Sequence, residues 1–341
     1  SVLHAASSCA CALLKLRALR RNLNKSDCIY RNSTHRKLSW PHPLGWHPAL
    51  SAAFGSAAQQ CSVGHMRLPL LATIAHTTRA ARYALRVAYD GTHFNGWQHQ
   101  PNARTVEGEL RKAFTTRFDG VNVPLLGASR TDSGVHARGQ AAHVDLPEEV
   151  ADVDLLKHQL NRMLPDDVRI NCVREAPPGG EKPWHAIACS TGKRYSYRMT
   201  ARYGSQDPLE RLYRAHVCYE DLDFALLSEA LRRCRGRFDF KAFANNAPTQ
   251  NPLEMDTIRE IRSIEAEDEG FGDYTVQIEL DGALYRMVRN VVGACVACGT
   301  GKLKIDELDE LLSGRKTRRD NPTKSAHARG LCLEEAFYDD F

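Results

Sequence analysis

A short stretch near residue 130 carries the side chains that are best suited to catalysis. Arg130 and Asp132 are separated by one residue, and Ser133 and Gly134 follow at once. Glycine adopts backbone angles that other residues avoid, so this order predicts a tight polar loop. A carboxylate at the tip of such a loop presents one reactive group to a substrate. The same residues also suit a surface turn with an ion pair, and spacing alone does not separate the two interpretations.

The residues on either side of this loop predict two strands that hold it. An apolar run over 123–126 leads into the loop, and residues 140–146 lead out of it with a period of two. That period places Gln140, Ala142, Val144 and Leu146 on one face of a strand, and Ala141, His143 and Asp145 on the other. The sequence therefore predicts a strand, a polar loop and a second strand.

Length and composition indicate a globular protein with room for two domains. The chain has 341 residues, of which 43% are hydrophobic and 26% charged. Ten of its 46 Lys and Arg residues lie in residues 1–80, together with one of its 41 Asp and Glu residues. The net charge of +5 thus belongs to the N-terminal segment. A nucleic-acid surface on the rest of the chain must be a local basic patch.

Residues 1–80 are rich in Arg, Ser and Ala and contain several prolines. This composition predicts an organellar, most simply mitochondrial, transit peptide followed by a linker. The alternative is a basic tail that contacts RNA. No apolar run approaches the length of a membrane span, so no membrane association is expected.

The eleven cysteines do not form a recognisable framework. Cys295 and Cys298 are spaced like a metal-binding pair, but no second pair completes a zinc site. We expect buried free thiols and no metal site.

Periodicity from residue 81 onward predicts alternating strands and helices. The expected strands are 83–89, 168–174, one around Tyr195 and Tyr197, 257–265, 274–280 and 330–338, and the expected helices are 105–118, 152–164, 222–233 and 284–298. In the last helix, three- and four-residue spacing groups Arg286, Arg289 and Asn290 on the face opposite the apolar residues. The segment PPGGEKP, 177–183, is the best candidate for a boundary between two halves. We therefore expect an N-terminal extension, 1–80, and two halves, 81–180 and 181–341.

Seven blocks of the chain resemble the tRNA pseudouridine synthase A (TruA) family. Residues 127–147, GASRTDSGVHARGQAAHVDLP, match the family pattern GRTDAGVHA-x-GQVxHFD. The other blocks follow in the family's order: YDGTHFNGWQHQ (89–100), LNRMLPDDVRI (160–170), WHAIACSTGKRYSY (184–197), DFKAF (239–243), MVRNVVG (287–293) and GLCLE (330–334). The resemblance covers the chain from about residue 81 and stops before residue 80.

The resemblance implies a fold and a set of site residues. The fold is of the α/β (α+β) class, in which two similar halves share a largely antiparallel mixed sheet flanked by helices, with a central cleft. Asp132 matches the catalytic aspartate, Arg130 the arginine that pairs with it, and Arg289 a second basic residue of the pocket. Tyr195 matches the tyrosine that packs on the target uracil. Leu331 is expected to line the floor of the pocket, and His185 to contact the substrate.

The reaction that the family implies is the conversion of uridine to pseudouridine in RNA, most simply in organellar tRNA. This is an isomerisation, so we expect no cofactor and no metal. The target base must leave its stack to reach the enzyme, which requires a cleft with basic walls. The family also implies a homodimer. The clusters 232–237 and 315–319 are candidates for phosphate contacts, and a solvated surface explains them equally well.

Two departures from the family pattern concern the grip on RNA. Ile187 stands where the family has an arginine, and Asp256 stands near a second position where an arginine is usual. These changes favour an altered RNA partner, such as organellar rRNA or mRNA, over loss of activity. An RNA-binding or ribosome-assembly protein with a vestigial pocket is a further hypothesis.

A metal-dependent hydrolase that uses Asp132, His136 and His143 is the remaining alternative. His136 and His143 are better explained as structural partners of the loop.

Overall fold

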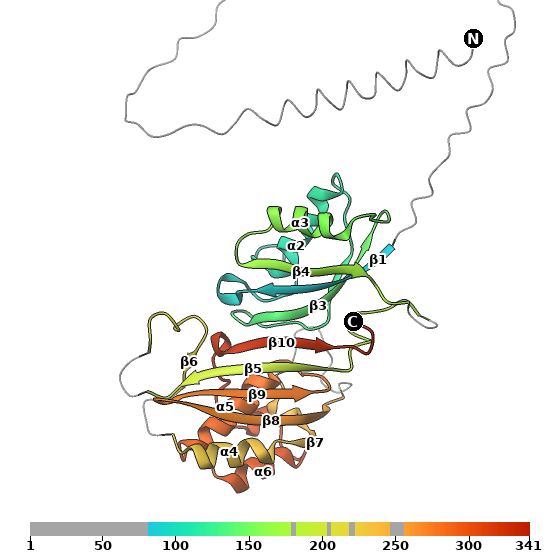
Figure 1. Cartoon of the computed structure of the whole chain (residues 1–341). Coiled ribbons are helices and arrows are strands. Elements are labelled where there is room, and N and C mark those ends of the chain that lie inside the picture. Colours follow the sequence, from blue (N-terminus) through green and yellow to red (C-terminus); the bar gives the residue numbers. More distant parts are fainter. Residues whose placement is uncertain (1–80, 179–181, 203–205, 218–221, 246–255) are drawn as a thin grey trace, which may run out of the picture. The chain divides into compact units, whose positions relative to one another are not determined.

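A mixed, largely antiparallel sheet runs through the part of the chain that the structure describes (Figure 1). The structure is a computed structural model, and it describes residues 81–341 except 179–181, 203–205, 218–221 and 246–255. The expected transit peptide and linker, 1–80, lie outside the described residues.

The order of the strands brings the end of the chain into the middle of the sheet. The order is β4 (Val168–Glu175), β1 (Ala81–Tyr89), β3 (His136–Leu146), β10 (Leu331–Phe337), β5 (Gly192–Thr200), β9 (Asp273–Leu280), β8 (Ile258–Gly270) and β7 (Gly236–Asp239). The short strands β2 (Leu125–Gly127) and β6 (Ala215–His216) pair with β3 and β5. The pairs β3–β10 and β5–β6 are parallel, and the other pairs are antiparallel. The expected sheet and its mixed α/β class are confirmed.

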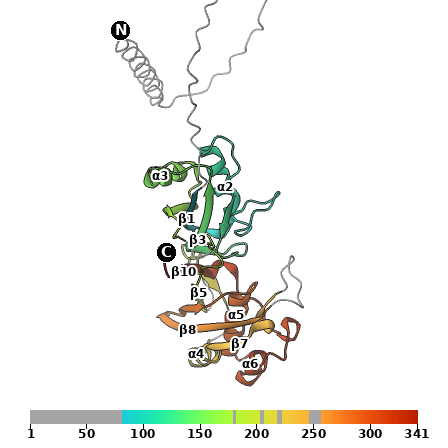
Figure 2. The same ribbon diagram turned by 90° about the vertical axis from the view of Figure 1, so that its right-hand side faces the viewer.

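Helices flank both groups of strands (Figures 1 and 2). The helices α2 (Val106–Arg117) and α3 (Val153–Met163) lie with β1, β3 and β4, whereas α4 (Phe224–Arg233), α5 (Met287–Gly299) and α6 (Ile305–Leu312) lie with β8 and β9. Thr105, Asp152 and Asp223 cap α2, α3 and α4, because each side chain accepts a hydrogen bond from a backbone N–H of the first turn. None of the helices in the described ranges is long and apolar enough to cross a membrane.

The helix expected at 284–298 begins three residues later than its apolar pattern indicates. Met287 is the first residue of α5, and Arg286 before it has a left-handed backbone with φ of 61°. Asn290 is fully buried, so its expected place on an exposed face is wrong. Periodicity misplaced it because Asn290 satisfies buried backbone groups, as described below.

Both faces of β3 are covered, although alternation alone suggested a more polar second face. One face belongs to the main core. The other packs Ala141 against a smaller apolar cluster that contains Trp184 and Ala336, with Tyr338 and Phe341 beside them. We define the Asp132 loop as residues 128–135. Residues that lie far apart in the sequence therefore cover β3, the strand that follows this loop.

The described cysteines are free thiols. Cys234, Cys295 and Cys298 are buried as expected, whereas Cys172 and Cys332 are half-buried and Cys189 is exposed. Cys234 and Cys295 are both buried, with their sulfur atoms 3.8 Å apart.

Candidate active site

A cavity of about 700 Å³ collects five of the six predicted site residues. Arg130 and Asp132 reach it from the Asp132 loop, Tyr195 from β5, Arg289 from the first turn of α5, and Leu331 from the first position of β10. These elements come from both ends of the described chain, so the fold rather than local sequence assembles the cavity.

Asp132 is paired with Arg289 inside this cavity. Nη1 of Arg289 donates to Oδ2 of Asp132 at 2.8 Å, and each side chain keeps only 13% of its surface exposed. Nε of Arg289 donates to the carbonyl of Ala326 at 2.8 Å, which fixes the direction of the guanidinium. A largely desolvated carboxylate is costly to bury alone, and the guanidinium offsets that cost.

Arg130 does not form the ion pair that the resemblance implies. Its side chain is exposed at the cavity, and within the described residues it makes no hydrogen bond or ion pair. Arg289 holds Asp132 instead, from a position 157 residues away in the sequence. The free guanidinium of Arg130 is therefore available to a ligand that carries negative charge.

Tyr195 and Leu331 supply the apolar wall of the cavity. Tyr195 is 4% exposed and Leu331 is 6% exposed. The phenolic oxygen of Tyr195 lies 3.1 Å from Oγ of Ser129. Burial raises the pKa of Tyr195 to about 12, so its phenol is neutral at physiological pH. A neutral aromatic ring and a leucine suit a flat, uncharged group such as a nucleobase.

His185, the sixth predicted residue, does not line the cavity. Its Nδ1 accepts hydrogen bonds from the backbone N–H groups of Ile187 and Ala188, at 3.2 Å each. Its ring centroid lies 4.8 Å from that of His143. His185 therefore shapes the turn that places Ile187 at the cavity.

The block YDGTHFNGWQHQ forms the cradle of the Asp132 loop, a role that the sequence did not reveal. A Cβ atom added to Gly91 would lie 2.0 Å from the carbonyl oxygen of Val135, so only glycine permits this close approach. The carbonyl of Phe94 accepts hydrogen bonds from the N–H of Gly134 and from Oγ of Ser133, both at 3.2 Å. The block thus holds the Asp132 loop in place through contacts with its backbone.

Trp97 supports the other side of the same loop. Its backbone N–H donates to the carbonyl of Thr131 at 3.1 Å, and its buried indole packs where a side chain at Gly127 would otherwise lie. The hydroxyl of Tyr89 lies 2.8 Å from that of Thr131. The residue that precedes Asp132 is therefore held through both its backbone and its side chain.

The block MVRNVVG seats Arg289 against Asp132. Asn290 donates to the carbonyl of Phe243 at 2.6 Å, and its side-chain oxygen accepts from Ser325. A Cβ atom on Gly293 would lie 2.1 Å from the carbonyl oxygen of Lys324, so the segment that follows Lys324 packs directly on the helix. These contacts explain why an asparagine and a glycine accompany the arginine.

Further charged residues line the cavity. Lys193, Arg237, Arg259 and Arg286 line it together with Asp256 and Asp281. Ile187 also lines it, so both departures from the family pattern, Ile187 and Asp256, face this space. The side chain of Asp256 accepts the N–H of Ile258 at 2.9 Å and lies 3.8 Å from Arg259.

The two basic clusters are less free than their sequences suggest. Arg232 and Arg233 pair with Glu229 at 2.6 and 2.7 Å. Arg318 donates to the carbonyls of Asn321 and Thr323 at 2.8 Å each. Within the cluster 232–237, Arg237 is the residue that reaches the cavity.

His136 and His143 serve as structural partners, and they do not join Asp132. Nδ1 of His136 accepts the N–H of Gly91 at 3.1 Å, and Nδ1 of His143 accepts the N–H of Ala186 at 3.2 Å. The described residues contain no group of three or more His, Cys, Asp and Glu side chains that could hold a metal ion. The hydrolase hypothesis therefore has no ligand set in this part of the chain.

Comparison with known proteins gives a consistent match. The family described as "tRNA pseudouridine synthase" matches residues 85–187 and 230–339. The tRNA pseudouridine synthase A of Acetivibrio thermocellus is 37% identical over 257 residues, which cover 74% of this chain and 98% of the relative. That of Streptococcus mutans is 34% identical over 260 residues, covering 76% of this chain and 99% of the relative.

A solved structure titled as a Cbf5–Nop10–Gar1 complex matches with a TM-score of 0.28 and 10% identity, over 74% of this chain and 59% of the other. The sequence matches span both groups of strands and the Asp132 loop. The chain belongs to the tRNA pseudouridine synthase A family, whose members are isomerases.

Proposed function

We propose that this protein converts uridine to pseudouridine in RNA, with tRNA as the favoured substrate and Asp132 as the catalytic residue. The observation that carries the proposal is the Asp132–Arg289 pair, held at 2.8 Å in a cavity that Tyr195 and Leu331 also line. The named relatives are tRNA pseudouridine synthases, which supports tRNA as the substrate.

The proposed reaction begins with Asp132 at the ribose of the target nucleotide. Its carboxylate either attacks C1′ or removes the C2′ proton to give a glycal, and the N1–C1′ bond breaks with its electron pair left on the uracil. The base rotates and C5 bonds to C1′. In the first route the Asp132–C1′ bond breaks at this step, and in the second route C2′ regains its proton from Asp132. The C5 proton is then lost while N1 gains one. Substrate and product have the same atoms and oxidation state, so the reaction consumes no external oxidant or reductant.

Arg289 orients the Asp132 carboxylate before the substrate arrives. The ring of Tyr195 offers a stacking surface to the flipped uracil, which contributes roughly 1–3 kcal/mol. Leu331 limits the depth of the cavity, and the exposed Arg130 meets the phosphates of the flipped nucleotide.

The wider setting is part of the same proposal. The composition of residues 1–80 supports import into an organelle, with the mitochondrion as our choice, and the family resemblance supports a homodimer. RNA is the expected partner, and the cations that line the cavity suit its backbone.

A second candidate is the same reaction on organellar rRNA or mRNA. Ile187 and Asp256 replace basic residues of the family pattern, and both line the cavity. The family pattern therefore has two positive charges that this chain lacks beside the entering RNA. Fewer contacts with RNA phosphates form there, which favours a different RNA substrate. A ribosome-assembly role with an inactive pocket is the third candidate.

Pseudouridine mapping tests these candidates against one another. The full chain and its Asp132→Asn variant are incubated with organellar tRNA, rRNA and mRNA transcripts. Asp166→Asn is the matched control, because Asp166 is a fully exposed carboxylate far from the cavity lining. We expect Asp132→Asn to lower the rate on the order of 10³-fold or more, and Asp166→Asn to leave it unchanged.

The class of RNA that gains Asp132-dependent pseudouridine identifies the substrate. Absence of such product from every RNA would overturn the enzymatic proposal and favour the assembly role.

A further inference from the structure

His136, the first residue of β3, joins three separate segments behind the Asp132 loop. Its Nδ1 accepts the N–H of Gly91 at 3.1 Å. Its Nε2 lies 3.1 Å from the carbonyl oxygen of Leu212 and 3.2 Å from that of Arg329. Nδ1 also lies 3.1 Å from Oδ1 of Asp90, so Gly91 and Asp90 meet at one side of the ring, and Leu212 and Arg329 meet at the other.

His136 lies where it can hold the Asp132 loop in position. It is the next residue after the loop, and the N–H of Val135 donates to the carbonyl of Asp132 at 3.1 Å. Gly91, the partner of its Nδ1, packs against the carbonyl of Val135. The ring of His136 therefore fixes the side of the loop that follows Asp132.

The carbonyl of Leu212 belongs to a segment of residues 206–214, which we call the strap. Tyr213 of the strap lies beside His136, with ring centroids 5.2 Å apart, and its hydroxyl donates to Oδ2 of Asp90 at 2.8 Å. Arg329 donates to the carbonyl of Arg211 in the strap at 3.0 Å. The strap and the turn before β10, η4 (Ala328–Gly330), thus meet at His136.

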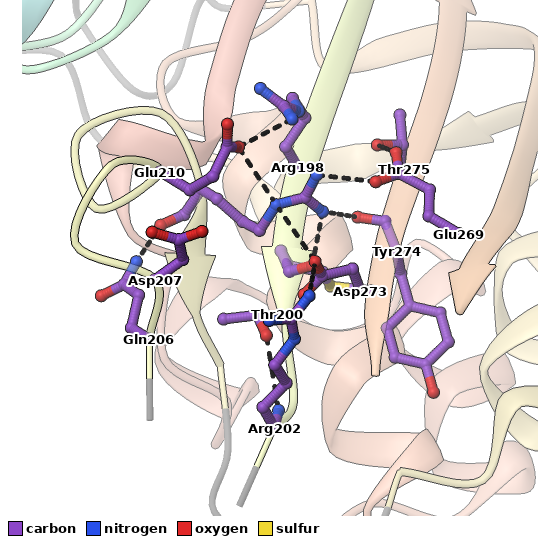
Figure 3. Close-up of polar contacts among 12 residues, drawn as sticks. Arg198, Thr200, Arg202, Gln206, Asp207, Glu210, Glu269, Asp273, Tyr274 and Thr275 are labelled. Carbon is purple, nitrogen blue, oxygen red and sulfur yellow. Dashed lines mark hydrogen bonds and ion pairs between the residues drawn. The ribbon is translucent and has the colours of Figure 1, made fainter. Parts of the chain in front are cut away.

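Neighbouring residues of the strap anchor it to the sheet. Arg214 is 4% exposed, and it donates to Glu269 at 2.6 Å and to the carbonyl of Met199 at 3.2 Å. Figure 3 shows Glu210 of the strap beside Arg198 of β5, and their side chains are 2.8 Å apart. The strap therefore moves with β5, β8 and β9, the strands that carry Tyr195 and border the cavity.

We propose that His136 is a positioning residue that fastens the strap and η4 to the Asp132 loop, and so holds Asp132 against Arg289. This inference rests on the proposed role of Asp132. It assigns a function to a histidine that touches neither the cavity nor the reacting atoms.

The surroundings of His136 favour its neutral form. Burial, the largest cause, lowers the pKa of His136, and the charge of Asp90 only partly opposes this. The titratable and charged groups around the ring are Asp90, Tyr213, Arg329 and Cys332, its partner in the β3–β10 register. A proton on Nδ1 would face the carboxylate of Asp90, 3.1 Å away, and would end the hydrogen bond from the N–H of Gly91.

Two variants separate the contacts of His136. Asparagine places an oxygen near Nδ1, so His136→Asn keeps the acceptor for Gly91 and loses the donor to the strap. Glutamine reaches the position of Nε2, so His136→Gln keeps a donor to the strap and loses the acceptor. His143→Asn is the matched control, because His143 is equally buried on the same strand but hydrogen-bonds to Ala186, away from the cavity.

The experiment combines steady-state kinetics on tRNA with amide hydrogen exchange of the full chain. We expect His136→Asn to lower kcat by about 10–100-fold with KM changed less than about threefold, because a misplaced catalytic group costs rate rather than binding. Exchange at the amides of Gly134 and Val135 should accelerate at least tenfold. His143→Asn should change neither.

The positioning role is overturned if His136→Asn keeps normal kcat and exchange. It is overturned equally if His143→Asn reproduces both effects, or if KM alone rises. Should the wild-type protein form no pseudouridine, the proposed function fails, and the exchange experiment still decides whether His136 holds the loop. If His136→Asn does not fold, His136→Gln tests the contact with Gly91 instead, and normal kcat and exchange in that variant would equally overturn the positioning role.

Discussion

At the scale of single residues, the pairing of Asp132 is the central finding. A loop aspartate was expected from the sequence, and the structure places it in a cavity with Arg289. Arg130, two residues before it, is exposed at the same cavity and free of protein partners within the described residues. We therefore propose different tasks for the two arginines, one within the protein and one toward the ligand.

Replacement of each arginine by glutamine separates these tasks. Arg289→Gln leaves a desolvated carboxylate without its charge partner, so we expect kcat to fall on the order of 10²-fold. Arg130→Gln should mainly weaken binding, and should reduce the slope of log affinity against log salt by about 0.7–0.9 if it removes one phosphate contact. Kinetics and RNA-binding titrations at several salt concentrations measure both. An Arg130 variant that loses kcat while keeping its salt slope would contradict this division.

At the scale of elements, the Asp132 loop and the start of α5 show what the sequence could predict. Motif order indicated which segments form the site, and the helices expected to start at 105 and 152 do begin there, with Thr105 and Asp152 as their N-caps. The supporting contacts were not predictable, because Gly91 and Asn290 act on backbone groups that lie far away in the sequence. Tertiary contacts, rather than local propensity, decide the role of such residues.

Gly293 gives this point a test with a clear sign. In an ordinary helix, glycine to alanine stabilises by about 1 kcal/mol. In α5 the new Cβ would lie 2.1 Å from the carbonyl oxygen of Lys324, so we expect Gly293→Ala to destabilise the fold by about 1–3 kcal/mol. Urea unfolding measures the change. A gain in the free energy of unfolding would show that residues 324–326 do not need this close contact.

At the scale of the whole described structure, one sheet includes strands from both of the halves that the sequence predicts, 81–180 and 181–341. The alternation of strands and helices predicted the elements and the class of the fold. It could not predict that β10 enters between β3 and β5, because strand order depends on contacts across hundreds of residues. The expected boundary at 177–183 remains a prediction, and the sheet continues across the two groups of strands. Arg82 of β1 pairs with Asp145 of β3 at 2.7 Å and donates to the carbonyl of Trp184, in the segment that leads into β5, at 2.9 Å.

His143 of β3 makes the contact between β3 and the segment around Ala186 sensitive to acid. Burial, helped by the charge of Arg82, lowers the pKa of His143 to about 4, from an ordinary value near 6.5. Because the folded state disfavours protonation, the stability from this group is complete above pH 6.5 and is lost as pH falls toward 4. The loss is at most about 3 kcal/mol, since one pKa unit corresponds to about 1.4 kcal/mol.

His143→Asn keeps an acceptor for the N–H of Ala186 and cannot titrate in this range. We expect the variant to resemble the wild type at pH 7 and to show a shallower decline in the free energy of unfolding between pH 6.5 and 4. Urea unfolding across that range measures the difference. Parallel curves for the two proteins would mean that other groups cause the acid sensitivity, and that the contact between β3 and the segment around Ala186 stays intact when His143 is charged.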